Sequence, residues 1–398
     1  MYFNSFQFLL LFLPVTLLGF YLINRVEPCR WPIVWLVGAS LVFYGFCNLV
    51  LVGVLIGSVL TNYVLGRFFY DSQISKVNLK KILYFGIICN LGVLIYFKQF
   101  GFYGGSQPQE FPPAYPWGVI IPVGLSFFTF QQIIYLVEVW RGRVEGNSFW
   151  NYFLYVVFFP QLLNGPIVRP NEFFPQLVDK KFFKLQADRI AAGLTIFSCG
   201  LFKKVVLADG IARYSDSAFD AVAQGAVLSM MEAWSGTLSF TLQVYFDFSG
   251  YSDMAVGLGC LLGIRLPINF ESPYKASSLI EFWHRWHMTL SRFVRDYIYI
   301  PLGGNRKGSL KRTGNIFIIM LIGGIWHGTG TTFIVWGSLH GGLLAINHLW
   351  RQLQNSLGYS LERKNFIYEI SGCVITFITV AVLWILFRAE GLDIAVSI

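Results

Sequence analysis

The five histidines of this chain all lie between His284 and His348, and one of them occupies an unusual place for a polar residue. His327 lies in a segment, Thr313–Trp350, that contains no Asp, Glu, Lys or Arg. An imidazole in such a segment loses solvation and tends to stay neutral, and neutral imidazole can accept a proton from a hydroxyl. A lone histidine in an apolar helix is also often only a hydrogen-bonded structural residue. The clustering of all five histidines favours a catalytic role.

A second candidate histidine, His287, belongs to a stretch with helical spacing of polar residues. On one helix spanning Glu281–Arg295, four polar side chains would share a face: His284, His287, Ser291 and Arg295. Tryptophan, leucine and phenylalanine side chains would cover another face. The pattern predicts an amphipathic helix whose polar stripe faces water or a cavity.

The segment that follows is strongly basic and is a candidate site for anionic groups. Arg285–Arg312 holds seven basic residues against one acid, Asp296, and its centre is a glycine turn followed by two cations. Backbone amides at such a turn, together with Arg and Lys, can hold phosphates. An ordinary cytoplasmic loop of a membrane protein would show the same charge. The candidate donor-binding residues are Ser291, Arg292, Arg295, Asn305, Arg306 and Lys307.

A buried neutral base, a second histidine and a basic loop suit the transfer of an acyl group to a hydroxyl. The donor would be an activated thioester that carries phosphates. Because a thioester is already activated, the reaction needs neither a metal ion nor a bound cofactor. No G-x-S-x-G elbow occurs in the sequence, so a covalent serine relay is unsupported.

The elements that position these residues are predicted to be membrane helices. The chain is 55% hydrophobic and 13% charged, whereas soluble domains carry about 25% charged residues. Uncharged runs such as Trp31–Gly66 and Phe111–Val137 are long enough to cross a bilayer, which takes about 20 helical residues. We therefore expect an all-α polytopic membrane protein with about nine to eleven transmembrane segments. The net charge of +9 comes from short loops between the apolar runs and does not indicate nucleic-acid binding.

Two places in the middle of the chain interrupt this pattern. Proline and glycine in Asn164–Pro170 break helices, which predicts a re-entrant loop or an interfacial bend that must be buried in protein. A plain surface connection is the alternative. Asp247 and Asp253 lie between apolar stretches, where a charge usually faces a partner or water. A structural role for both, with Asp253 capping a following helix, is the simpler interpretation.

Several strings together resemble the membrane-bound O-acyltransferase (MBOAT) superfamily, in its bacterial alginate O-acetyltransferase-like branch. Related branches acetylate peptidoglycan or D-alanylate teichoic acid, so the resemblance defines the reaction better than the acceptor. The matching strings, which occur in the family's order, are Pro122–Gln131, Phe159–Gln161 with Gly165-Pro166, Tyr245–Asp253, Phe282–His287, Tyr299–Arg306 and Trp326–Gly328.

The resemblance implies a fold and a role for each matching residue. His327 of W-H-G would be the catalytic histidine and His287 its companion, while His284 matches a more variable position and ranks lower. The fold would be a ring of tilted helices with re-entrant segments around a central tunnel. Residues 1–398 would form one domain with its catalytic core at 120–330. Members usually carry further membrane segments after the counterpart of Phe387–Ala389, whereas this sequence stops at Ile398, so C-terminal helices are expected to be missing.

The resemblance also implies where the protein works and with what. It places the chain in a bacterial inner membrane as a multi-pass protein. The donor would be acetyl-CoA or another acyl thioester, and the acceptor would be an extracytoplasmic polysaccharide or a hydroxyl on a partner protein. A separate extracytoplasmic acetyltransferase would complete delivery.

Two other classes of function stay open on the sequence alone. Glu281-x-x-His284 resembles a di-iron ligand pair, and His327 with His340 could act as axial haem ligands, as in a membrane oxidoreductase. A transporter could instead use Asp247 and Asp253 along a substrate pathway, although no internal symmetry supports one.

Overall fold

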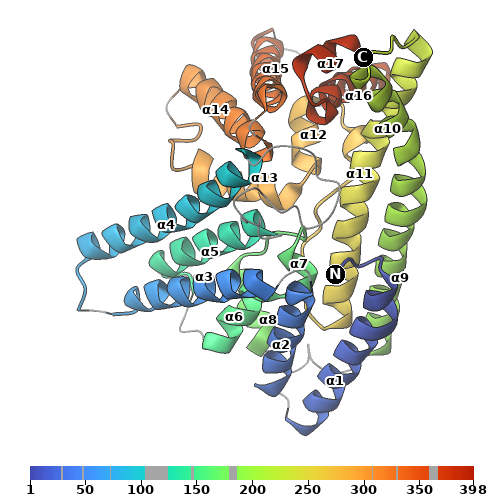
Figure 1. Ribbon diagram of the computed structural model, residues 1–398. Coiled ribbons are helices and arrows are strands. Elements are labelled where there is room, and N and C mark those ends of the chain that lie inside the picture. The colour runs from blue at the N-terminus through green and yellow to red at the C-terminus, as the bar shows by residue number, and fades with distance from the viewer. Residues whose placement is uncertain are drawn as a thin grey trace. The chain divides into compact units, whose positions relative to one another are not determined.

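The computed structural model describes residues 1–27, 30–46, 49–71, 73–103, 124–144, 148–178, 186–306, 308–328, 330–357 and 366–398. Throughout these ranges the regular structure is helical (Figure 1). The prediction of an all-α protein is therefore confirmed. Contacts between Cα atoms group the chain into two compact units, and the two are described separately below.

The first unit comprises Met1–Leu201 and Tyr251–Pro267. Within the uncharged run Trp31–Gly66 one helix ends at Gly45 and the next begins at Leu49. Pro14 and Pro32 lie in the first turns of their helices, where the missing N–H has no intrahelical partner to lose. The helices of this unit are η1 (Gln7–Phe12, a π-helix), α1 (Leu13–Val26), α2 (Trp31–Gly45), α3 (Leu49–Phe68), α4 (Lys76–Tyr103), α5 (Leu125–Trp140), α6 (Phe149–Val157), α7 (Phe159–Leu162), α8 (Pro170–Val178) and α9 (Ala187–Phe202).

The second unit comprises Phe202–Gly250 and Ile268–Ile398 and contains the candidate site. Its long helix α11 (Met230–Leu261) begins here, and its last part belongs to the first unit. Asp253 therefore lies inside α11, so the prediction that it caps a following helix is wrong. The other helices are η2 (Lys203–Ala208), α10 (Asp209–Ala223), η3 (Pro273–Lys275), α12 (Leu279–Arg285), α13 (Met288–Val294), η4 (Arg295–Tyr299), α14 (Ser309–His327), α15 (Thr331–Ser356), α16 (Phe366–Arg388) and α17 (Leu392–Ser397).

Five helical stretches of the described chain are long and apolar enough to cross a membrane. They are Gln7–Val26, Leu51–Phe68, Lys76–Lys98, Ala187–Ala223 and Phe366–Arg388. Two shorter apolar helices, α2 and α5, add to them. The polytopic membrane character is confirmed, although fewer helices meet these criteria than the nine to eleven segments expected. Long helices such as α11 and α15 carry polar side chains and glycines within their span, and they are not among the five.

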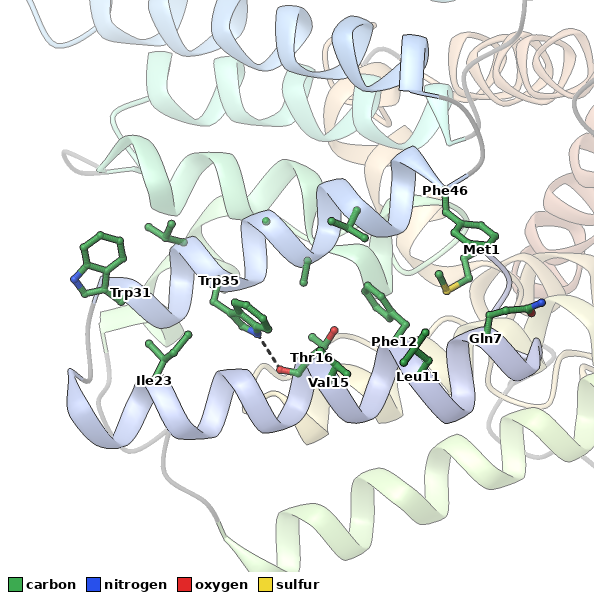
Figure 2. Close-up of a pocket in the computed structure, with 14 residues that line it drawn as sticks. Met1, Gln7, Leu11, Phe12, Val15, Thr16, Ile23, Trp31, Trp35 and Phe46 are labelled. Atoms are coloured by element: carbon green, nitrogen blue, oxygen red, sulfur yellow. Dashed lines mark hydrogen bonds between the residues drawn. The ribbon is translucent and has the colours of Figure 1, made fainter.

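An apolar groove runs between α1 and α2 in the first unit (Figure 2). It has a volume of about 800 Å³ and extends from Trp31 and Ile23 at one end to Phe46 and Met1 at the other. The indole of Trp35 crosses it and donates a hydrogen bond to the Thr16 carbonyl at 3.0 Å. This hydrogen bond ties the two helices of the hairpin together.

The proline- and glycine-rich segment between α7 and α8 is buried, as the prediction required. Ile167 and Val168 are almost fully covered, and the Tyr155 hydroxyl lies 2.9 Å from the Val168 carbonyl. A side chain at Gly165 would overlap the backbone of Gln161, so the tight turn needs glycine there. The alternative of a plain surface connection is therefore wrong. Irregular backbone at membrane depth is tolerated because protein covers it and satisfies its polar groups.

A network of amide side chains joins three membrane helices of the first unit. Asn62 on α3 and Asn90 on α4 are buried, and Asn90 Nδ2 donates to Asn62 Oδ1 at 2.7 Å and to the Gly86 carbonyl at 2.8 Å. Asn62 Nδ2 donates in turn to the Ser58 carbonyl and to Gln132 of α5. In a bilayer the hydrophobic effect does not drive helices together, because lipid tails are as apolar as the helix surfaces. Side-chain hydrogen bonds of this kind therefore contribute to helix association.

Candidate active site

The hairpin of α14 and α15 positions His327 at the end of a helix and close to the next one (Figure 1). The two helices approach closely because glycines face each other: a side chain at Gly324 would overlap the Phe333 carbonyl, and one at Gly337 would overlap the Met320 carbonyl. The backbone then leaves the helix at Gly328 in an extended conformation. His327 is thus the last residue of α14 and lies against the first turns of α15.

Aromatic rings surround the His327 imidazole. Its ring centroid lies 4.6 Å from that of Trp326, 5.6 Å from that of Trp336 and 4.9 Å from that of Phe387. His327 itself is half-buried. Its surroundings therefore supply an apolar wall, and part of the ring is left uncovered by protein.

His287 lies at a break between two short helices, so the prediction of one continuous helix over Glu281–Arg295 is wrong. α12 ends at Arg285, Trp286 is extended, and α13 begins only at Met288. His287 has φ 42°, in the left-handed region that side chains other than glycine rarely adopt. The backbone amide of Met288 donates to the carbonyl of Asn269 at 2.9 Å. A loop distant in sequence thus stabilises the break between the two helices.

The side chain of Asn269 fixes the tautomer of His287. Asn269 Oδ1 accepts hydrogen bonds from the Thr289 amide at 3.2 Å and from the Thr289 hydroxyl at 2.9 Å, so this atom is the acceptor oxygen. The same oxygen lies 3.0 Å from His287 Nδ1, which must therefore carry a proton. In the neutral ring the lone pair is then on Nε2. The Phe248 ring packs edge-on against the imidazole at 4.7 Å and limits its rotation.

Burial, together with a smaller effect of the neighbouring His327, lowers the pKa of His287 from 6.5 to about 3. His287 lies outside the five candidate membrane helices and is almost fully covered by protein. The two histidines lie close enough to interact electrostatically, so protonation of one disfavours protonation of the other. The structure thus brings together the two residues predicted to be catalytic.

The other predicted residues on this segment have separate environments. His284 is exposed on α12. Ser291 donates its hydroxyl to the Trp283 carbonyl at 3.1 Å, which joins α13 to α12. Arg292 is half-buried on α13, and Arg295 is exposed and pairs with Asp296 at 2.8 Å.

The predicted glycine turn is present, with Gly303 and Gly304 at positive φ. Its backbone amides are largely used within the turn, because those of residues 302, 303, 304 and 306 donate to carbonyls of residues 298–303. They are therefore not available to phosphates as the sequence suggested. The side chains of Asn305 and Arg306 are exposed, and the Tyr299 hydroxyl donates to Asn305 Oδ1. Lys307 lies outside the described residues.

The two predicted aspartates, Asp247 and Asp253, have different environments. Asp247 belongs to the second unit, where Lys204 Nζ lies 2.5 Å from its Oδ1 and 2.8 Å from Asp209 Oδ1. Lys204 belongs to the π-helix η2, a helix type often found at functional sites. Asp253 belongs to the first unit and is half-buried within α11. Among the described residues, Asp247 forms its ion pair with Lys204, and this pair involves neither Asp253 nor the two histidines.

Sequence reasoning missed the groups that surround the histidines. Asn269, Trp336 and Phe387 carry no motif signal, because each acts through a contact between distant segments. Glu281 accepts hydrogen bonds from the Ser277 amide and hydroxyl and from Arg285, as in a helix-capping arrangement, so its part in a di-iron pair loses support. Over the described residues, no group of three or more His, Cys, Asp and Glu could hold a metal ion.

A protein-family model described as MBOAT, membrane-bound O-acyltransferase family, matches residues 36–386. The chain belongs to this family. A peptidoglycan O-acetyltransferase of Helicobacter pylori is 39% identical over all of this chain and 78% of its own length. A probable alginate O-acetylase of Pseudomonas aeruginosa is 37% identical, covering 99% of this chain and 73% of that protein. A teichoic acid D-alanyltransferase of Bacillus subtilis is 28% identical over 68% of this chain and 69% of its own length.

Membership of the membrane-bound O-acyltransferase family confirms the predicted resemblance and the predicted class of enzyme. The protein is a membrane-bound acyltransferase. The oxidoreductase and transporter alternatives fall with this assignment. The motifs that carry the two histidines, Phe282–His287 and Trp326–Gly328, both lie within the matched residues.

Proposed function

We propose that this protein transfers an acyl group, normally acetyl, from a cytosolic thioester such as acetyl-CoA to a hydroxyl outside the cytoplasm. The acceptor is a cell-surface or secreted polysaccharide, reached directly or through a separate extracytoplasmic acetyltransferase. The protein works in a bacterial inner membrane. The O-acetyltransferase names of two relatives favour acetyl over other acyl groups. The observation that carries the proposal is the pair formed by His327 and His287 in one unit, with the tautomer of His287 fixed by Asn269.

The reaction follows from the two imidazoles. His327 takes the proton of the acceptor hydroxyl while the hydroxyl oxygen attacks the carbonyl carbon of the thioester. A C–O bond forms, and the electrons of the C=O bond move to the carbonyl oxygen. When that bond reforms, the C–S bond breaks, and the thiolate takes the proton from His327. The products are an ester and a free thiol, and no metal or cofactor enters the balance.

His287 assists without exchanging a proton. Its Nδ1–H is held by Asn269, so its Nε2 lone pair can accept a hydrogen bond from the acceptor hydroxyl or from protonated His327. Because burial keeps His287 neutral, it does not repel the positive charge that forms on His327. The role of His287 is thus to orient the hydroxyl and to steady the developing charge.

The basic segment is the proposed contact for the donor's phosphates. Arg306 and Asn305 are exposed in the turn after η4, and Arg292 and Arg295 precede it. Exposed guanidinium groups can bind phosphate through paired hydrogen bonds without backbone amides. This assigns donor binding to side chains rather than to the turn itself.

Acetyl transfer by the purified full-length protein in proteoliposomes tests the proposal. H327A is expected to lower the rate of acetyl-CoA turnover about 10²–10⁴-fold, because general acid–base assistance contributes that much. The matched control is H348A, which removes a half-buried histidine from the distal part of α15 and is expected to keep the wild-type rate. Equal rates in H327A and wild type would eliminate His327 as the base.

A further inference from the structure

Two buried side chains of α15 each contain a ring nitrogen that has no hydrogen-bond partner among the described residues: Trp336 Nε1 and His340 Nε2. Trp336 and His340 lie one turn apart on the same face of α15, and each is only 1% exposed. Their ring centroids are 4.7 Å apart, and the Trp336 ring also contacts His327. Trp336 therefore contacts both the proposed base and His340, and the three rings belong to one cluster.

Both nitrogens are hydrogen-bond donors. An indole Nε1 always carries its proton. His340 Nδ1 accepts a hydrogen bond from the Trp283 indole at 3.4 Å, so Nδ1 is unprotonated. The neutral His340 ring must then carry its proton on Nε2. The two side chains thus present two N–H groups and no acceptor for either of them within the described chain.

Other indoles of the same aromatic cluster do have acceptors. Trp384 Nε1 donates to the Tyr274 hydroxyl at 3.2 Å, and Trp283 Nε1 donates to His340. Trp384 stacks on Trp336 with ring centroids 5.9 Å apart, so the two residues share one environment. A buried donor without an acceptor is costly, and a catalytic role, a bound ligand or an ordered water are the explanations for it in native proteins.

We propose that Trp336 Nε1–H and His340 Nε2–H form the binding subsite for the carbonyl oxygen of the acyl thioester. This inference rests on the proposed function and names two further catalytic residues for it. When the acceptor oxygen attacks, the C=O electron pair moves onto this oxygen, and two fixed N–H dipoles in an apolar surrounding stabilise the negative charge. The pair then returns to reform C=O as the C–S bond breaks. The donors keep their protons throughout.

The substitution W336F tests the indole donor, because it removes the N–H and keeps an aromatic ring. Loss of one such donor lowers kcat about 10²–10³-fold. The KM for acetyl-CoA is expected to change little, since the charge develops only during the reaction. The matched control is W384F, which removes an N–H that already has an acceptor in the same cluster. W384F is expected to lower the unfolding temperature and to keep kcat near that of the wild type.

The second donor is tested by H340L and H340Q. Leucine supplies no N–H, so H340L is expected to lose kcat to a similar extent as W336F. Glutamine offers an amide N–H, so H340Q is expected to recover part of the loss. Should W336F not fold, H340L with H340Q carries the same test.

A spectroscopic measurement separates this inference from the proposed function. Acetyl-CoA bound to H327A cannot react quickly, and its thioester carbonyl stretch is expected at lower frequency than in water because the two donors polarise it. That shift is expected to shrink in H327A/W336F. An inactive H327A together with a fully active W336F would overturn the subsite and leave the proposed base intact. An active H327A would overturn the proposed function instead.

Discussion

Two pairs of buried polar side chains, one pair in each unit, differ in how they are hydrogen-bonded. In the first unit, Asn62 and Asn90 bond to each other and to carbonyls of their own helices. In the second unit, His287 and His340 are each held at Nδ1 by one neighbour, Asn269 or Trp283. The amides are tied at both ends and serve as interhelical contacts. A histidine anchored at one ring nitrogen has its other nitrogen set in position for a substrate.

The largest change in the rate of acetyl transfer is expected on substitution of Asn269, and this substitution tests the proposed difference between the two regions most strongly. N269A removes the acceptor that fixes the His287 tautomer, and a wrongly oriented histidine can cost up to about 10⁴-fold in rate. We expect acetyl transfer to fall at least about tenfold. N269D keeps an acceptor oxygen and should be more active than N269A. A wild-type rate for N269A would show that the anchor at Nδ1 has no catalytic importance.

The next effect concerns stability against pH. The pKa of His287 is about 3 in the folded protein, against 6.5 for a free histidine side chain, so the unfolded chain binds more protons between these values. The contribution of neutral His287 to the free energy of unfolding is complete above about pH 6.5 and is lost as the pH falls toward 3. Over that range the free energy of unfolding changes by up to about 1.4 kcal/mol per pH unit. Thermal unfolding in detergent between pH 7 and pH 4.5 measures it. H287Q should show a shallower slope, and identical slopes would contradict the neutral buried state.

A smaller effect is expected in the amide network, on stability rather than on rate. A double-mutant cycle of N62A and N90A should give a coupling free energy of about 0.6–1.7 kcal/mol, the range for side-chain hydrogen bonds between membrane helices. Unfolding of the protein in mixed micelles measures it. Acetyl transfer by the folded fraction should stay near wild type. A large loss of rate with little loss of stability would reverse the roles assigned to the two regions.

The smallest effect is expected at the exposed Arg306. R306Q removes one screened cation from the proposed donor contact, and such contacts contribute about 0.2–1 kcal/mol. The KM for acetyl-CoA should rise no more than about fivefold, and the rise should shrink at high salt. R25Q, in the exposed last turn of α1, is the control. A KM that is unchanged at low salt would exclude this residue from donor binding.

Much of the fold was predictable because apolar runs and their charged ends depend on the membrane alone. The buried segment after α7 followed from its glycine and proline residues. The sequence singled out His327 because an imidazole in an uncharged segment is rare, and His287 because of the spacing of polar residues around it; their catalytic roles stay predictions. The break at Trp286–His287 was not, because local spacing favours one helix and the loop residue Asn269 overrides it. The roles of Trp336 and Phe387 likewise arise only when α14, α15 and α16 pack together.

The loop residue Asn269 has a consequence for how the enzyme matures after insertion. Its carbonyl and its side chain together shape the bend at His287, from eighteen residues upstream. Membrane helices can be inserted one by one without that contact, because each satisfies its own backbone. A newly made molecule could therefore be fully embedded and still inert until this loop docks, so the capacity to react would be acquired in the last steps of assembly.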